Sequence, residues 1–232
     1  MLIKGFLGTS LIDFPGRISS IVFTGGCNFR CPFCHNADLV LDYKNLPTLT
    51  EDEVLEKIKK RKGFIDGVEI TGGEPLLYND TLDFIKEVRE LGYQVKLDTN
   101  GYFPDKLEEI LDSGMVDFVA MDIKSSPEKY SYACGIEIDL KKIENSISLI
   151  MSKAKEYEFR TTVAPKIVEE EDIIPMVKMI EGAEMYALQE FRPVKTIDPA
   201  FMEIAPYPKE VLFHFAEIAK PYVKKIEVRT EG

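Results

Sequence analysis

The stretch Gly25-Gly26-Cys27-Asn28-Phe29-Arg30-Cys31-Pro32-Phe33-Cys34-His35-Asn36 holds three of the chain's four cysteines, at the spacing C-x3-C-x2-C. Thiolates this close together on a turn can converge on one inorganic centre, and soft sulfur ligands favour zinc, copper(I) or iron–sulfur clusters. A structural zinc site or an ordinary ferredoxin cluster takes four protein ligands, whereas only three lie here. A four-iron cluster at this loop would therefore leave one iron open to an exogenous ligand.

The rest of the chain alternates short β-branched runs with amphipathic helical patterns. The cysteine loop directly follows the first run, and we expect strands at residues 18–24, 67–71, 94–99, 116–122, 158–163, 185–189 and 225–229. Between them, Thr50-Glu51-Asp52-Glu53 forms a capping box, Pro104 suits a first helical turn, and Gly92 and Gly114 suit helix ends. Six or so β–α repeats predict an α/β fold with parallel strands and outer helices, a partial (β/α)6 TIM-like barrel.

The chain has 232 residues, of which 45% are hydrophobic, and this length fits one domain with a sizeable core. No low-complexity linker or break in composition divides it, so we expect a single domain over residues 1–232. Within that domain we expect an N-terminal turn or strand segment at 1–17 and a barrel core at 18–190. A C-terminal loop, helix and strand would follow at 191–232.

Charge and composition exclude several classes of partner. The net charge is −11, whereas general binding to a nucleic-acid backbone draws on an excess of lysine and arginine. No apolar run is long enough for a bilayer helix, and the N-terminus lacks the architecture of a signal peptide. The cysteine cluster and the lack of an even disulfide framework favour a reducing cytosol. We therefore expect a cytoplasmic protein that binds neither nucleic acid nor membrane.

Polar residues gather where the predicted strands end. After the cysteine loop they occupy positions 71–75, 98–101, 122–124, 160–162 and 189–192. In a barrel of parallel strands, ligands bind at the rim formed by the C-terminal strand ends. Gly72-Gly73-Glu74 would allow close approach of the backbone and supply one carboxylate suited to an ammonium group.

The motifs together resemble a known family. Cys-Pro-Phe-Cys-His-Asn, Ile-Thr-Gly-Gly-Glu-Pro, Lys-Leu-Asp-Thr-Asn-Gly and Ala-Met-Asp-Ile-Lys resemble the radical S-adenosylmethionine (SAM) superfamily, specifically its glycyl-radical-enzyme activating enzymes. The likeness runs along nearly the whole chain, from Asp13-Phe14-Pro15-Gly16 to Ile226-Glu227-Val228-Arg229. It is greatest to the activating proteins of anaerobic ribonucleoside-triphosphate reductase. In that family, the segment that matches Asp13 to Gly16 lies beside the active site.

The resemblance implies a site residue by residue. Cys27, Cys31 and Cys34 would bind a [4Fe–4S] cluster, whose fourth iron SAM chelates through its amino and carboxylate groups. Asp98, Thr99 and Asp122 would hold a monovalent cation. The implied cofactor-binding residues are Phe33, Cys34, His35, Gly72, Gly73, Glu74, Asp98, Asn100, Asp122, Lys124, Arg160 and Gln189. Gln189 departs from relatives that have histidine there, and Lys124 and Arg160 read equally as ion-pair partners. For Cys134 we expect a small buried thiol.

The resemblance also implies the reaction. The reduced cluster would pass one electron to the sulfonium of SAM, giving methionine and a 5′-deoxyadenosyl radical that abstracts hydrogen from a glycine of a partner enzyme. That partner would be anaerobic ribonucleoside-triphosphate reductase, and flavodoxin or ferredoxin would donate the electron. Open alternatives are pyruvate formate-lyase or another glycyl-radical enzyme as target, and a radical SAM enzyme for a small molecule. An alternative from a different functional class is a zinc-stabilised interaction module or an electron carrier.

Overall fold

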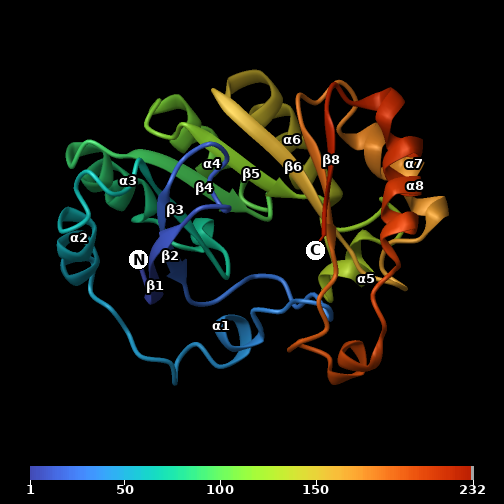
Figure 1. Ribbon diagram of the computed structural model, residues 1–232, viewed down its shortest axis with the longest axis horizontal. Coiled ribbons are helices and arrows are strands. Elements are labelled where there is room, and N and C mark those ends of the chain that lie inside the picture. Colours follow the sequence, from blue (N-terminus) through green and yellow to red (C-terminus); the bar gives the residue numbers. More distant parts are fainter. Residues whose placement is uncertain (231–232) are drawn as a thin grey trace.

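Eight strands form one sheet in chain order, from β1 to β8 (Figure 1). The computed structural model describes residues 1–230, so the last two residues of the predicted C-terminal segment lie outside it. The strands are β1 (Ile3–Ser10), β2 (Ser19–Thr24), β3 (Gly67–Gly72), β4 (Gln94–Thr99), β5 (Phe118–Asp122), β6 (Glu156–Val163), β7 (Tyr186–Glu190) and β8 (Ile226–Arg229). Strands β2 to β8 run parallel, and the sheet does not close between β1 and β8. This is the predicted α/β fold with a partial barrel.

Most helices cover the outer face of the curved sheet, whereas α1 and α5 lie beside the cysteine loop (Figure 1). The helices are α1 (Ala37–Leu41), α2 (Glu51–Lys59), α3 (Thr81–Glu90), α4 (Pro104–Asp112), α5 (Tyr130–Cys134), α6 (Leu140–Lys153), α7 (Glu170–Met179) and α8 (Lys209–Ala219). Short 3-10 turns lie at Pro75–Leu77, Pro199–Glu203 and Lys220–Tyr222. The predicted capping box at Thr50 and Glu53 is present at the start of α2. Along the described residues, no helix has both the length and the apolar content that crossing a bilayer requires.

The two faces of the sheet differ in chemistry because successive strand residues point to opposite sides. On β4, Val95 and Leu97 join the apolar core beneath the helices, whereas Lys96 and Asp98 point to the other face. The other parallel strands repeat this alternation, and on β3 it is Glu69 that points to the same face as Lys96 and Asp98. An ordinary TIM barrel fills its interior with branched apolar side chains. Here the interior carries charged residues, and these need partners inside the protein.

The N-terminal ends of the parallel strands lie toward the top of Figure 1, and we call them the lower end of the barrel. This end is closed by the segment between β1 and β2. Phe14 is fully buried there and packs with Phe118 and Ala120 in a small apolar cluster apart from the main core. Arg17 lies over the Phe14 ring and binds Gln94 and Glu156. The resemblance implied that 13–16 lie beside the active site, but the structure brings only Asp13 to the upper cavity described below.

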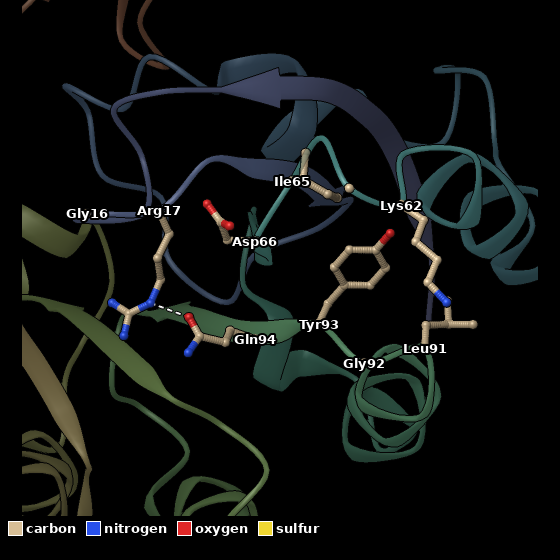
Figure 2. Close-up of a pocket in the computed structure, with 10 residues that line it drawn as sticks. Gly16, Arg17, Lys62, Ile65, Asp66, Leu91, Gly92, Tyr93 and Gln94 are labelled. Carbon is tan, nitrogen blue, oxygen red and sulfur yellow. Dashed lines mark hydrogen bonds between the residues drawn. The ribbon is translucent and has the colours of Figure 1, made fainter.

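A hollow of about 570 Å³, which we call the lower hollow, lies at this end of the barrel, and Figure 2 shows it between the N-terminal ends of the strands and neighbouring loops. Arg17 and Gln94 lie together at one side of it, joined by a hydrogen bond. Its lining residues are Gly16, Arg17, Lys62, Gly63, Ile65, Asp66, Leu91, Gly92, Tyr93 and Gln94. None of the predicted site residues is among them.

The N-terminal segment, predicted as a turn or strand over 1–17, contains strand β1, whose sequence, with Gly5 and Gly8 and a mixed burial pattern, lacks the alternation of a half-buried strand. Helix α7 begins at Glu170 and contains Pro175. Asp172 is the third residue of this helix, and its Oδ2 accepts a hydrogen bond from Glu169 N at 2.9 Å.

Candidate functional site

A cavity of about 400 Å³, which we call the upper cavity, lies at the C-terminal ends of the strands. Among the predicted site residues it is lined by Cys27, Cys31, Phe33, Cys34, His35, Gly72, Gly73, Asp98, Thr99, Asn100, Asp122, Lys124, Arg160 and Gln189. The remaining one, Glu74, does not line it. The C-terminal parts of six strands and the loops that follow them therefore meet at one place, because parallel strands bring their C-terminal ends to the same edge.

The loop after β2 reaches this cavity by packing closely on the loop after β3. Glu74 N donates a 2.9 Å hydrogen bond to the carbonyl of Gly26. A Cβ atom on Gly73 would lie 1.9 Å from that same carbonyl oxygen, so no residue but glycine fits without displacing the backbone. The Gly-Gly pair thus brings the second motif against the cysteine loop.

The cysteines of this loop are free thiols in different surroundings. Cys31 is buried, whereas Cys27 and Cys34 are partly exposed. Burial raises the pKa of Cys27 to about 12 and also raises the pKa of Cys34. A hydrogen bond from Cys134, buried at the end of α5 as predicted, lowers the pKa of Cys31. The Lys124 ammonium acts in the same direction on the pKa of each of the three.

This donor set fits a [4Fe–4S] cluster. Soft thiol donors are the ligands such clusters use, and here three of them line one cavity. The high pKa of Cys27 and Cys34 means that these thiols stay protonated until a cationic centre replaces the protons. Within the described residues, no three His, Cys, Asp or Glu side chains are placed to hold a single metal ion.

A buried charge network forms the wall beside the thiols. Arg160 bridges two strands: its Nη2 lies 3.0 Å from Asp98 Oδ2, and its Nε lies 3.0 Å from Asp122 Oδ1. Lys96 Nζ lies 2.6 Å from Asp98 Oδ1, and Lys124 Nζ lies 2.9 Å from Asp122 Oδ2. Although burial alone would raise the pKa of Asp122, Lys124 and Arg160 hold that pKa far below its usual range. Both carboxylates are therefore ionised and compensated.

The residues of the predicted monovalent-cation site thus have partners already. Each carboxylate oxygen of Asp98 and Asp122 accepts from a lysine or arginine side chain. The Thr99 hydroxyl donates to Glu74 Oε1 at 2.8 Å. The structure brings the three residues together, but the positive charge between the two carboxylates is the Arg160 guanidinium.

Glu74, which the resemblance predicts to bind SAM, is buried directly behind the glycines that line the cavity. The residue is 1% exposed, and its carboxylate accepts three hydrogen bonds, from Leu76 N at 3.0 Å, Asn100 N at 2.7 Å and the Thr99 hydroxyl at 2.8 Å. Burial outweighs these bonds and raises the pKa of Glu74 to about 7. In this structure the side chain joins the loops after β3 and β4, and only the two glycines before it line the cavity.

Sequence reasoning missed two charged residues in the interior. Lys96 is fully buried and lies 3.2 Å from Glu69 Oε1, and Glu69 lines the cavity. Burial raises the pKa of Glu69 well above its usual value. The available signal was their position: each occupies the middle of a predicted strand, where an apolar residue would be expected on a buried face.

Comparison with known proteins agrees with this geometry. The family model of the Radical SAM superfamily matches residues 21–180. A Methanocaldococcus jannaschii protein named as a glycyl-radical enzyme activating enzyme is 35% identical over 99% of this chain and 96% of its own. The pyruvate formate-lyase-activating enzyme of Clostridium pasteurianum is 37% identical over 58% of this chain and 60% of its own.

A solved structure shows the same fold. A domain of a pyruvate-formate lyase-activating enzyme from Bacteroides vulgatus superposes with a TM-score of 0.58, covering 71% of this chain and 99% of that domain at 19% identity. The chain belongs to the radical SAM superfamily, whose enzymes use a [4Fe–4S] cluster and SAM. Within that superfamily its full-length and partial relatives place it with the glycyl-radical-enzyme activating enzymes.

Proposed function

We propose that this enzyme generates the glycyl radical of anaerobic ribonucleoside-triphosphate reductase. The observation that carries the proposal is the meeting of three thiols and the polar ends of five further strands around one cavity. The choice of partner is supported by the motifs in sequence, which resemble the activating proteins of that reductase most. When bound, the cluster and SAM supply the electron transfer and the hydrogen-abstracting radical.

The chain's own residues would bind and orient these groups. We assign Cys27, Cys31 and Cys34 as the cluster ligands. The side chains proposed to contact SAM are Phe33, His35, Glu74, Asp98, Asn100, Asp122, Lys124, Arg160 and Gln189, together with the backbone of Gly72 and Gly73. Phe33 is buried and lines the cavity, so its ring offers an apolar wall for the adenine.

The charge network would keep the cavity wall fixed while ligands enter. Because Arg160 and Lys124 already hold Asp122, the wall does not need to reorganise when a charged ligand arrives. Glu74 contributes from behind the wall by holding the loops after β3 and β4 together. We also propose a monovalent cation at Asp98, Thr99 and Asp122, and its binding, unlike that of SAM, would require Arg160 to move away from the two carboxylates.

A second candidate target is pyruvate formate-lyase, which is favoured by the likeness to its activating enzymes. The test is anaerobic reconstitution followed by incubation with SAM, a reductant and each candidate partner in turn. We expect a glycyl-radical EPR doublet with the reductase, and none when Cys27 is replaced by alanine. A doublet with pyruvate formate-lyase alone would refute the choice of partner. Formation of 5′-deoxyadenosine only on addition of a metabolite would refute protein activation.

Two finer points follow from the same proposal. We propose a small electron-transfer protein, flavodoxin or ferredoxin, as the electron donor, because the reaction consumes one electron per radical formed. We also propose a cytoplasmic location, since free thiols of this kind persist in a reducing compartment. Reconstituted turnover with purified flavodoxin or ferredoxin in place of a chemical reductant tests the first point.

A further inference from the structure

One cysteine sulfur of the loop receives a hydrogen bond from a side chain on a distant strand end. Asn100, in the loop after β4, places its Nδ2 3.7 Å from Cys27 Sγ and 2.8 Å from Asn28 Oδ1. The backbone N of Phe29 donates to the same sulfur at 3.3 Å. Cys27 therefore accepts both a local backbone bond and a bond from 73 residues along the chain.

The orientation of the Asn100 carboxamide is fixed by its other contacts. Its Oδ1 accepts from the backbone N of Tyr102 at 3.0 Å, and this donor can only face an oxygen. Its own backbone N donates to Glu74 Oε2 at 2.7 Å, which anchors the main chain. The side chain is 6% exposed and has little room to turn. The amide N–H groups consequently point toward Cys27 and Asn28.

The other two sulfurs differ in their donors. Cys34 accepts from the backbone N of Asn36, a residue of its own loop. Cys31 accepts from the thiol of Cys134, a weak donor. Cys27 is thus the ligand that a strong side-chain donor ties to the wall of the cavity. Hydrogen bonds to ligand sulfurs are among the factors that set the reduction potential of an iron–sulfur cluster.

We propose that Asn100 is a positioning residue for the cluster, holding Cys27 through its amide and raising the reduction potential of the bound cluster. This inference rests on the proposed function, because it takes Cys27 as a cluster ligand. The N–H donor stabilises negative charge on the sulfur, so it favours the reduced and more negative state. It assigns to Asn100 a contact with the cluster ligand in addition to the contact with SAM predicted from the sequence.

The test is the midpoint potential of the reconstituted holoenzyme without SAM, measured by anaerobic EPR redox titration. Asn100→Ala removes the donor, and Asn100→Asp keeps the acceptor for Tyr102 N while replacing the donor by a carboxylate oxygen. We expect both variants to have a lower midpoint potential than wild type, and Asn100→Asp to have a lower one than Asn100→Ala. Asn36→Ala is the matched control, since its carboxamide lines the same cavity but bonds Gly72 O at 3.3 Å. Its potential should equal that of wild type.

A second measurement covers the case in which the Asn100 variants load no iron. Protein with Asn28→Asp and Asn36→Asp, labelled with ¹⁵N only in asparagine carboxamides, keeps Asn100 as the labelled side chain beside Cys27 and should show a ¹⁵N coupling in pulsed EPR of the reduced cluster. No coupling, or unchanged potentials in fully loaded Asn100 variants, would overturn the role of Asn100. Wild-type protein that takes up no iron would instead overturn the proposed function, so the two failures are distinguishable.

Discussion

Both ends of the barrel carry charged side chains and a hollow, but only the upper end gathers the residues of a candidate site. The lower hollow, at about 570 Å³, and the upper cavity, at about 400 Å³, are of comparable size. At the lower end, Arg17 pairs with Glu156, whose side chain is 50% exposed. At the upper end, Arg160 pairs with Asp98 at side-chain exposures of 14% and 10%. The comparison shows that buried, mutually compensated charge distinguishes a site better than volume does.

The largest effect concerns the thiols, which only the upper end has. We expect Cys34→Ala to lose essentially all cluster iron after anaerobic reconstitution and to cleave SAM only at background level, because two ligands cannot replace three. Iron analysis and formation of 5′-deoxyadenosine measure both effects. Gln94→Ala, at the lower end, is the control and should load iron fully. Full iron loading of Cys34→Ala would mean that Cys34 is not a cluster ligand.

The next effect concerns the buried network. Arg160→Ala leaves Asp98 and Asp122 each with a carboxylate oxygen deprived of its arginine partner. Loss of one partner of a buried ion pair typically costs about 3–5 kcal/mol of stability. We expect a decrease of this order, measured by anaerobic urea unfolding with variant and wild type in the same cluster-loaded state. A change below about 1 kcal/mol would mean that water replaces the guanidinium, and the wall would then not be prearranged.

Glu74 predicts a dependence on pH. Its pKa is raised from 4.5 to about 7 in the folded protein, so the fold favours the protonated form. The stabilisation is complete below pH 4.5 and is lost as the pH rises through about 7, a change of about 3 kcal/mol. Glu74→Gln cannot ionise. We therefore expect the stability of wild type relative to this variant to fall between pH 5 and 8, in parallel urea titrations. A pH-independent difference would contradict the raised pKa.

The smallest effect is expected at the lower end. Arg17→Ala removes an ion pair to a half-exposed carboxylate and a cation–π contact to Phe14. Exposed ion pairs typically contribute about 0.2–1 kcal/mol, and salt screens them. We expect a decrease of this size at low salt, shrinking in urea titrations at higher salt. A decrease as large as that of Arg160→Ala would abolish the contrast between the two ends.

Sequence reasoning recovered the seven parallel strands because their β-branched runs and capping signals act locally. It also gathered the site residues, since parallel topology places all C-terminal strand ends at one rim. The side-chain pairings within the site were beyond it. Whether Asp98 faces a metal ion or Arg160, and whether Glu74 points to the cavity or behind it, depends on packing between strands distant in sequence. For edge strand β1, the sequence left open a turn or a strand over 1–17, because the glycines at positions 5 and 8 weaken the pattern.

The unclosed sheet has a consequence for solvent access. Strands β1 and β8 end the sheet without meeting, and Leu7 on β1 lines the upper cavity while remaining 46% exposed. The cavity is therefore open to solvent beside β1 unless another molecule covers it. A docked partner would thus exclude water from this side of the cavity as well as serve as the substrate. Cleavage of SAM by the enzyme without a partner would measure how far solvent enters the cavity at that side.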